Sequence, residues 1–314
     1  MGKIDIDALP VIETIPGDAS SRRYRRVRLP GGGTAVEVQY PPGSGITFSK
    51  DLEVRDWLER HRLRVPRLIA IDPATSRAVL EDFGPCGASA TLRSMPSGAR
   101  SAAARALVTP LEILARIDPA TLPAWNAPLD EHRMRWELAG FELWFLRYGR
   151  GLSPSPAVGH WLDELAARVA AHPRRVCHRD YHTDNLFLLQ NGEVGVIDFQ
   201  DLLIGPESYD LVSLIGERDL PSLLPGGDLA EVSAEWARRT GAAPGWEDRL
   251  TETAAQRGLK VLGTFARLVA SGREGYRRWL EELVPRQAAL LRALGAPEEL
   301  VAALSGDTPP TDAR

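Results

Sequence analysis

The sequence has few cysteines, no long apolar run and no secretory signal, and each of these absences excludes a class of protein. Its two cysteines, Cys86 and Cys177, are too few for a disulfide framework and fit a reducing compartment. No apolar run approaches the ~18 residues that span a bilayer, so we predict no membrane helix. The opening residues MGKIDIDALP are acidic and lack an apolar stretch, so we expect no secretory signal. Together these absences predict a cytoplasmic protein.

The chain also lacks an excess of positive charge. The 314 residues carry 38 lysines and arginines against 42 aspartates and glutamates, a formal net charge of −4. Such a chain is not drawn to nucleic acid by its overall charge, so we expect no nucleic-acid partner. The exception is a cluster of five arginines within residues 22–28. Because the cluster lies on a predicted strand, we expect one or two of these arginines to contact phosphate groups and the others to be solvated.

The apolar pattern predicts strands first and helices afterwards. Residues 22–29 and 34–40 flank PGGG and predict a hairpin, and residues 49–61 predict a helix with Ser49 as N-cap. VPRLIAID and SRAVLEDF predict two further strands before the crossing GPCGAS. Helical periodicity then marks residues 98–117, 129–148, 157–172, 228–240, 247–271 and 275–294.

This order of elements predicts an α+β fold with two lobes. We expect a β-rich N-terminal lobe over residues 1–84 and a mostly helical C-terminal lobe over residues 85–304. Residues 305–314 are polar and proline-rich and predict a disordered tail.

One charged stretch interrupts the helical part, VCHRDYHTDNLFLLQNGEVGVIDFQD at residues 176–201. His178-Arg179-Asp180, followed after four residues by Asn185, matches the kinase catalytic-loop pattern H-R-D-x-x-x-x-N and predicts a kinase-like fold. NLFLLQ and EVGVIDF are joined by Asn-Gly, a strong hairpin signal that folds Asp198 back beside Asn185. We predict Asp180 as the catalytic base, and Asn185 and Asp198 as Mg²⁺ ligands for bound ATP.

Two other interpretations of this stretch are weaker. His178 and His182 are spaced to hold zinc on a helix, but the other histidines lie far away along the chain. A solvated acidic loop would have no reason to match the kinase pattern in residue type, spacing and strand context together. We expect His178 to support the loop rather than to act in catalysis.

Protein kinases have an A-P-E segment after the second aspartate, and this chain has none, which favours a small acceptor. In this respect it resembles the aminoglycoside phosphotransferase and choline kinase superfamily, and the resemblance implies that Asp210 in YDLVSL braces the catalytic loop.

Segments from about residue 13 to residue 294 more closely resemble the bacterial cell-wall amino-sugar kinases. These segments are GDASSRRYRRV, RVPRLIAID, LEDFG, CHRDYHTDNL, VIDFQD, GPESYDLVSL and QRGLKVLGTFARL. The resemblance implies phosphorylation of N-acetylmuramic acid and N-acetylglucosamine at the anomeric hydroxyl, for cell-wall recycling.

The nucleotide side departs from the kinase pattern. The predicted third strand, TAVEVQY, lacks the lysine that kinases bring to the phosphates, and the chain has only Lys3, Lys50 and Lys260. The resembled family also lacks this lysine, so its absence does not imply lost activity. Either an arginine from residues 22–26 or Lys50 takes its place, or the phosphates rely on metal and backbone alone. Glu53 is the expected partner of whichever cation serves.

We expect GDASSRRY to take the place of a glycine-rich loop and to present backbone N–H groups to the phosphates. The backbone of LEDFG follows the fourth predicted strand, where kinases bind adenine. The residues expected to bind the nucleotide are Ser20, Ser21, Arg22, Arg23, Lys50, Glu81 and Phe83.

The sequence says least about which residues bind the acceptor. Trp144, in the aromatic helix WELAGFELWFLRYG, is a candidate platform for a sugar, although its spacing is more typical of core. Asp201 is a candidate for binding sugar hydroxyls or for bracing the loop. Two alternatives stay open: an aminoglycoside or amino-alcohol kinase, and a nucleotide-binding pseudokinase. The oligomeric state stays undetermined.

Overall fold

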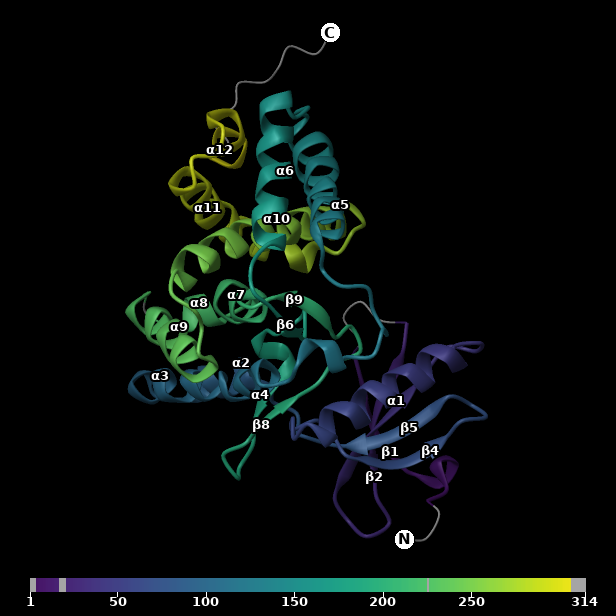
Figure 1. Ribbon diagram of the computed structural model, residues 1–314. Helices are drawn as coiled ribbons and strands as arrows, with labels where there is room; N and C mark the ends of the chain where they lie inside the picture. Colours follow the sequence, from purple (N-terminus) through teal and green to yellow (C-terminus); the bar gives the residue numbers. More distant parts are fainter. Residues whose placement is uncertain (1–3, 17–20, 225, 306–314) are drawn as a thin grey trace.

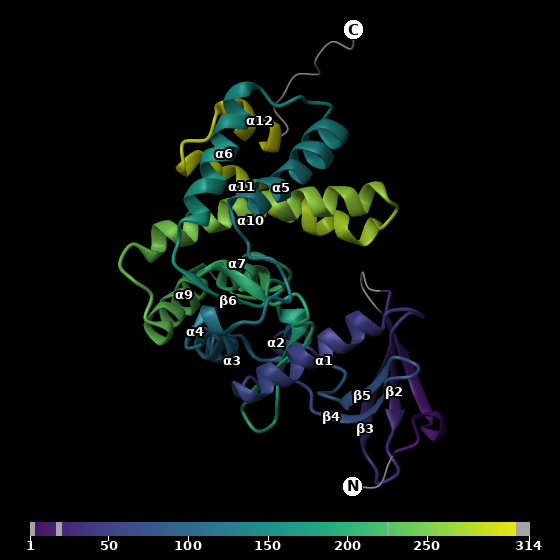
Figure 2. The same cartoon turned by 45° about the vertical axis from the view of Figure 1, so that its right-hand side comes forward.

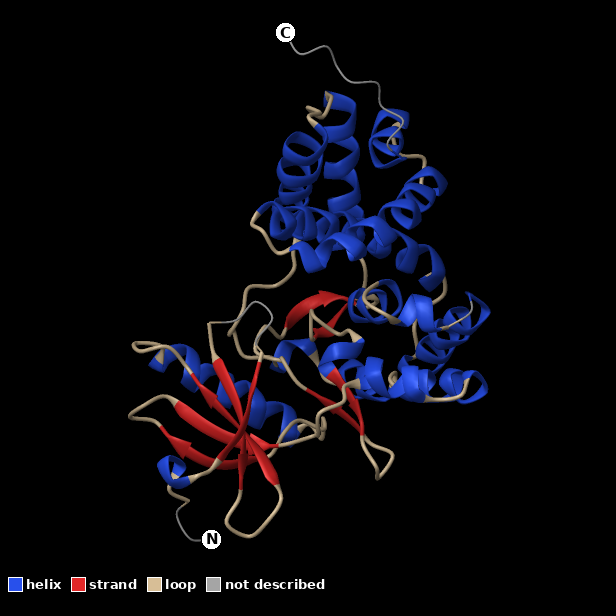
Figure 3. Cartoon of the chain, turned by 180° about the vertical axis from the view of Figure 1, so that it is seen from behind, coloured by secondary structure: helices blue, strands red, loops and turns tan. Residues whose placement is uncertain are grey.

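The computed structural model describes residues 4–16, 21–224 and 226–305. Figure 1 shows an N-terminal lobe of strands with one long helix and a C-terminal lobe of helices. In Figure 3 the long strands lie in the N-terminal lobe, and short strands lie among the helices of the other lobe. This confirms the predicted two-lobed α+β architecture. The boundary at residue 84 stays a prediction, and the predicted tail lies outside the described residues after Ser305, the last residue of α12.

The N-terminal lobe holds one antiparallel sheet with the strand order β1-β2-β3-β5-β4. The predicted hairpin around PGGG is confirmed, and its register pairs Arg23 with Gln39 and Arg28 with Thr34. The strands are β1 (Val11–Ile15), β2 (Arg23–Arg28), β3 (Thr34–Gln39), β4 (Leu68–Asp72) and β5 (Arg77–Glu81), preceded by the short η1 (Ile6–Ala8).

The helix α1 (Gly45–Arg60) lies on the side of this sheet that faces the C-terminal lobe, as Figure 2 shows. It begins four residues before the predicted N-cap, so the assignment of Ser49 was wrong. Its N-cap is Ser44, which makes no side-chain capping bond. The chain turns into the helix at Gly43, whose positive φ of 83° suits glycine, and the apolar residue Phe48 is already buried in the second turn.

Helices build the C-terminal lobe. The predicted helix at 98–117 is two helices, because Pro110 in the first turn of the second cannot donate a backbone hydrogen bond to a preceding turn. The predicted helix at 129–148 is α5 followed by the π-helical η3. The helices are α2 (Ala88–Ser94), α3 (Ser97–Ala106), α4 (Thr109–Ala115), α5 (Glu131–Phe141), η3 (Glu142–Gly149), α6 (Pro156–Ala170), α7 (Tyr209–Gly216), α8 (Leu220–Leu223), α9 (Gly226–Thr240), α10 (Trp246–Ala270), α11 (Arg277–Ala293) and α12 (Glu298–Ser305), with short turns η2 (Pro119–Thr121), η4 (Thr183–Asn185) and η5 (Glu274–Tyr276).

Two pairs of short strands carry the charged stretch. β6 (Arg174–Cys177) pairs with β9 (Leu203–Pro206), and β7 (Leu186–Leu188) pairs with β8 (Val194–Val196), both antiparallel. The hairpin predicted from Asn-Gly is therefore confirmed, and Gly192 in its turn has a φ of 83°. No helix among the described residues is long and apolar enough to cross a membrane.

The longest helix, α10, is the centre of the distal half of the C-terminal lobe. It packs against α5, α7 and α11, and its buried face belongs to the larger hydrophobic core. Gly263 marks a close crossing with α5, because a Cβ atom at this position would lie 2.6 Å from the backbone nitrogen of Phe141. The crossing holds α5 and α10 at a spacing that only glycine allows.

This crossing predicts a stability defect. We expect Gly263→Ala to lower the free energy of unfolding by about 1–3 kcal/mol, since the added methyl must push two helix backbones apart. Chemical denaturation followed by circular dichroism measures it. The matched control is Gly159→Ala inside α6, where nothing lies within 4 Å of the added Cβ, so stability should stay equal or rise. Equal effects of the two substitutions would contradict a tight crossing.

Candidate active site

The predicted catalytic residues follow the two short strand pairs. Asp180 lies in the loop after β6, Asn185 ends η4, and Asp198 follows β8. The backbone N–H of Ile197 donates to the carbonyl of Asn185 at 3.0 Å. This hydrogen bond continues the β7–β8 pairing and brings the two predicted metal ligands to adjacent positions.

Asp210, at the start of α7, holds the catalytic loop by its backbone. Its two carboxylate oxygens accept the N–H groups of His178 at 2.6 Å and Arg179 at 2.9 Å. The carboxylate is buried, and burial raises its pKa despite these bonds. Arg179 is held at a φ of 79°, a conformation unfavourable for a residue with a Cβ. The bracing role implied for Asp210 is confirmed by this geometry.

His178 supports the same loop. Its side chain is fully buried, and Nε2 lies 2.9 Å from the carbonyl oxygen of Ile197. Because the ring bridges the catalytic loop and the loop after β8, the structure agrees with a supporting role. His178 and His182 do not lie on a helix, and the described residues contain no group of three side chains that could hold a metal through histidine, cysteine or carboxylate.

Cations surround Asp180. Burial acts to raise the pKa of this carboxyl, but the charges of Lys260, Arg257 and Arg179 outweigh burial and hold the pKa well below its usual value. Arg257 Nη2 lies 3.8 Å from Asp180 Oδ1, and the aspartate side chain remains 36% exposed. Asp180 is therefore an accessible, fully ionised carboxylate. Burial lowers the pKa of the neighbouring His182 to about 3, so this ring is neutral.

The two predicted metal ligands present oxygen atoms. Asn185 donates its Nδ2 to the carbonyl of Asp180 at 2.9 Å, which leaves its amide oxygen for a metal. Asp198 has a φ of 62° and accepts a bond from Gln200 Nε2 at 2.9 Å, and its side chain is 39% exposed. An amide oxygen beside an accessible carboxylate is a donor set that fits Mg²⁺.

Arg22 forms ion pairs with carboxylates of both lobes. It precedes β2, and its guanidinium lies 3.2 Å from Asp51 on α1 and 3.5 Å from Asp198. Tyr40 donates its hydroxyl to the same Asp51 oxygen at 2.6 Å, while the other oxygen, Oδ1, is buried and accepts no hydrogen bond from the described residues. The Arg22 guanidinium therefore joins α1 of the N-terminal lobe to the loop after β8 that bears Asp198.

Asp51, and not Glu53, is the carboxylate of α1 that pairs with Arg22. Glu53 instead accepts a bond from Trp125 Nε1 at 3.2 Å. Lys50 donates to Asn126 Oδ1 at 3.3 Å.

The remaining arginines of the cluster divide between ion pairs and solvent. Arg25 pairs with Glu37 at 2.7 Å and Arg26 with Asp82 at 2.6 Å, so both guanidinium charges are engaged within the protein. Ser21 and Arg23 are exposed near the start of β2. Ser20 lies outside the described residues.

Glu81 and Phe83 link the sheet to the C-terminal lobe. Burial would raise the pKa of Glu81, but bonds from Arg64 and Arg67 outweigh it and lower the pKa to about 2. The N–H of Glu81 donates to the carbonyl of Arg67 at 2.9 Å and so is not available to an adenine. The ring of Phe83 fills the space beside Gly195 on β8, where a Cβ would lie 2.5 Å from the ring.

The two acceptor candidates lie in different surroundings. Asp201 Oδ2 lies 3.8 Å from Arg179 Nη1, which places it beside the catalytic loop. Trp144 is partly buried against the hydrophobic core, and its ring centroid lies 5.7 Å from that of Tyr148. Trp136, in the same aromatic segment, is 70% exposed.

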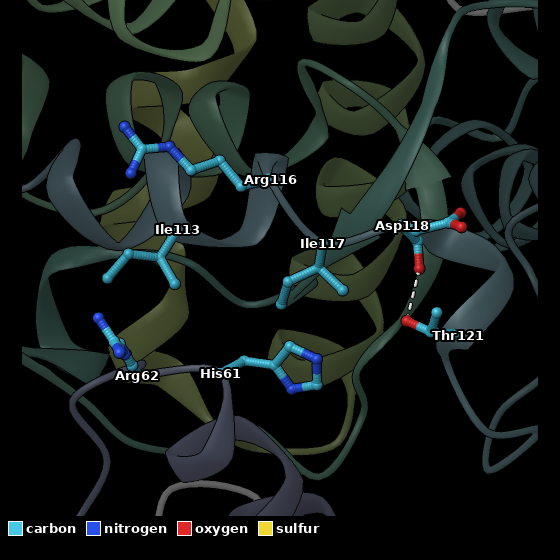
Figure 4. A pocket seen from close by; sticks show the side chains of 7 residues that line it. All are labelled: His61, Arg62, Ile113, Arg116, Ile117, Asp118 and Thr121. Carbon is cyan, nitrogen blue, oxygen red and sulfur yellow. Dashed lines mark hydrogen bonds between the residues drawn. The ribbon is translucent and has the colours of Figure 1, made fainter.

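A separate hollow of about 360 Å³ lies between the end of α1 and α4. In Figure 4 its side chains converge from the two lobes, and it is lined by His61, Arg62, Ile113, Arg116, Ile117, Asp118 and Thr121. No residue predicted for the active site lines it.

The arrangement defines a kinase-like phosphotransferase site, with a catalytic loop, a second loop bearing an aspartate and a cation from the N-terminal lobe. Residues 11–250 match the family model of the phosphotransferase enzyme family, and the chain belongs to this family. The prediction of an ATP-dependent phosphotransferase is confirmed.

Two relatives resemble most of the chain. Both are named N-acetylmuramate/N-acetylglucosamine kinase. One, from Pseudomonas aeruginosa, is 31% identical over 88% of this chain and 82% of its own length. The other, from Neisseria meningitidis serogroup B, is 30% identical over 90% of each chain. The resemblance to amino-sugar kinases is confirmed.

Solved structures support the fold. A choline kinase from Streptococcus pneumoniae superimposes with a TM-score of 0.62 at 11% identity, covering 90% of this chain and 95% of its own. An aminoglycoside-3'-phosphotransferase of type VIII gives a TM-score of 0.56 at 23% identity, covering 80% and 93%. The kinase-like fold predicted from the catalytic loop is therefore confirmed.

The position of Arg22 generates a test. We expect Arg22→Ala to raise the KM for ATP by about tenfold or more, since a charge-assisted contact is lost, and Arg22→Lys to restore part of it. Steady-state kinetics with varied ATP measures the change. Arg28→Ala, at the exposed far end of β2, is the control and should change the KM less than about twofold. Similar KM values for the alanine variants would show that Arg22 does not serve the nucleotide.

Proposed function

We propose that the protein transfers the γ-phosphoryl group of ATP to the anomeric hydroxyl of N-acetylmuramic acid, N-acetylglucosamine or both, giving the sugar 1-phosphate. The observation that carries the proposal is the braced loop with Asp180 in a chain that is 31% identical to a kinase named for these sugars over 82% of that relative's length. Its place would be the recycling of cell-wall sugars in the cytoplasm, where ATP is available.

Asp180 would receive the proton of the acceptor hydroxyl. Its lowered pKa makes it a weak base, and a weak base suits a hydroxyl that is itself acidic. The anomeric hydroxyl is more acidic than an ordinary alcohol. In a loose transition state little proton transfer is needed early, so Asp180 would first orient the hydroxyl and then take the proton late.

The nucleotide would lie between the lobes. Asn185 and Asp198 would hold Mg²⁺, which when bound neutralises charge on the phosphates. Arg22 would contact the phosphates from the opposite side. The other nucleotide contacts that we propose are the loop residues Ser20, Ser21 and Arg23, with Lys50, the carbonyl of Glu81 and the backbone of Phe83.

The alternatives fit the site less well. A polycationic aminoglycoside would approach Asp180 through the charges of Arg179, Arg257 and Lys260, which repel it. A pseudokinase is suggested by the missing strand lysine, but Arg22 supplies a cation at Asp198. For the acceptor we propose Asp201, beside the catalytic loop, with Trp144 as the more distant candidate.

Paired substitutions separate the two proposed roles. We expect Asp180→Asn to lower kcat by about 100-fold or more with little change in Mg·ATP affinity, because the base acts on the acceptor. We expect Asp198→Ala to weaken Mg·ATP binding, because a metal ligand is lost. Turnover assays and titration calorimetry measure both. Normal kcat in the first variant, or normal Mg·ATP affinity in the second, would refute the corresponding assignment.

The position of phosphorylation is tested on the wild-type enzyme. Phosphorylation at C1 removes the reducing end of the sugar, whereas phosphorylation at C6 keeps it. We expect ADP release from Mg·ATP with each sugar to be matched by loss of reducing ends. Release of ADP with the reducing end preserved would refute the anomeric assignment, and no ADP with either sugar would refute the amino-sugar proposal.

A further inference from the structure

The segment 122–130, which connects η2 to α5, is bonded to both lobes. Near its start, Trp125 donates its Nε1 to Glu53 of α1 at 3.2 Å. Near its end, the N–H of Leu129 donates to the carbonyl of Ile204 on β9 at 2.8 Å. We call these residues the connecting segment, because they tie the helix of the N-terminal lobe to the strand that follows the loop of Asp198.

Asn126 lies in the middle of the connecting segment and engages each polar atom of its side chain. Its Nδ2 donates to the carbonyl of Gln200 at 3.0 Å and to that of Leu202 at 2.8 Å. Its Oδ1 accepts a bond from Lys50 Nζ at 3.3 Å. Since two carbonyl oxygens can be met only by the amide nitrogen, these partners determine which way the amide faces.

The carbonyls that Asn126 binds lie just after Asp198, in a loop that needs support. Asp198 has a φ of 62°, which a residue with a Cβ keeps only where its surroundings hold it. Gln200 also donates its own Nε2 to Asp198 Oδ1 at 2.9 Å. Before the aspartate, His178 Nε2 lies 2.9 Å from the carbonyl of Ile197. The loop is therefore held on both sides of Asp198, by the catalytic loop and by the connecting segment.

Asn126 also provides a second route from α1 to this loop. The first route is the guanidinium of Arg22, which lies 3.2 Å from Asp51 and 3.5 Å from Asp198. The second begins at Lys50, the neighbour of Asp51 on α1, and continues through the amide of Asn126. The first route acts on the carboxylate itself, whereas the second holds the backbone that follows it.

We propose that Asn126 is a positioning residue, which holds Asp198 in its orientation for Mg²⁺ by fixing the backbone of Gln200. This inference rests on the proposed function, in which Asp198 is a metal ligand. Because its polar atoms are all engaged within the protein, Asn126 acts on the metal only through Gln200. Loss of the groups that orient a metal-binding carboxylate typically lowers metal affinity about 10- to 100-fold.

The test replaces Asn126 by aspartate, which keeps the shape of the side chain and the acceptor for Lys50 but removes both donors. A carboxylate oxygen then faces the carbonyls of Gln200 and Leu202, so the loop should separate from the connecting segment. We expect the affinity for Mg·ATP to fall about tenfold, and the affinity for ATP in EDTA to change less than about twofold. Titration calorimetry measures both, and binding of ATP in EDTA also reports that the variant is folded.

Hydrogen exchange of the metal-free protein gives a readout that needs neither metal nor turnover. We expect the amides of residues 198–203 to exchange about tenfold faster in Asn126→Asp than in the wild-type protein, because the loop opens more often. Thr121→Val is the control. It removes a hydrogen bond of 2.7 Å to the carbonyl of Asp118 in the preceding turn, and it should change neither the exchange of this loop nor the affinity for Mg·ATP.

Gln200→Leu tests the proposed route, because it lacks the donor to Asp198. We expect this variant to bind Mg·ATP as weakly as Asn126→Asp, and the double variant to be no more than about twofold weaker than either. Fully additive losses in the double variant would overturn the route through Gln200.

Three other results would overturn the inference. They are an unchanged affinity of Asn126→Asp for Mg·ATP, an equal loss of affinity for ATP in EDTA, and unchanged hydrogen exchange in residues 198–203. Failure of the proposed function is recognised separately. If Asp198→Ala keeps normal affinity for Mg·ATP, the metal assignment is wrong, and the role of Asn126 in metal binding is refuted with it.

Discussion

The bonds from the Asp210 carboxylate to two consecutive backbone N–H groups are the interaction on which the site depends. They hold His178 and Arg179 in place, at 2.6 and 2.9 Å, and thereby fix the direction in which Asp180 leaves the strand β6. Arg179 keeps a φ of 79° there, which an unsupported loop would relax. The side chain of His178 in turn holds the loop of Asp198 through its hydrogen bond to the carbonyl of Ile197. The buried carboxylate of Asp210 on α7 therefore positions the catalytic loop directly and the loop of Asp198 through His178.

The charged groups of the site are of two kinds: those paired within the protein and those that stay partly exposed to solvent. Arg257 pairs with Glu217 and Arg179 with Glu137, so carboxylates of the protein hold both cations beside Asp180. Asp180, Asp198 and Lys260 keep partial exposure. The balanced groups resemble a fixed electrostatic background, which costs no reorganisation during reaction.

The sequence predicted what is determined locally. The catalytic loop, the two predicted metal ligands and the hairpin between them depend on fixed spacing and turn chemistry, and the structure brings Asn185 and Asp198 together as expected. Long-range pairing was not predictable. Asp51 and Glu53 lie on one helix about 200° apart, and only the position of Arg22 decides which of them faces the cleft. The aromatic spacing in residues 136–149 likewise could not show that Trp136 would be exposed and Trp144 half-buried.

The contacts of Phe83 join the N-terminal lobe to the β7–β8 hairpin. Its ring fits the space that Gly195 leaves on β8, Arg64 lies over the ring at 4.8 Å, and the carbonyl of Arg64 accepts the N–H of Val196 at 2.8 Å. The backbone hydrogen bond and the ring in the space beside Gly195 hold the N-terminal lobe against the β7–β8 hairpin. Arg22 and Asp198, which lie 3.5 Å apart, form a second link between the lobes. The first link is made by backbone and apolar atoms and the second by two charges, so added salt weakens the second more than the first.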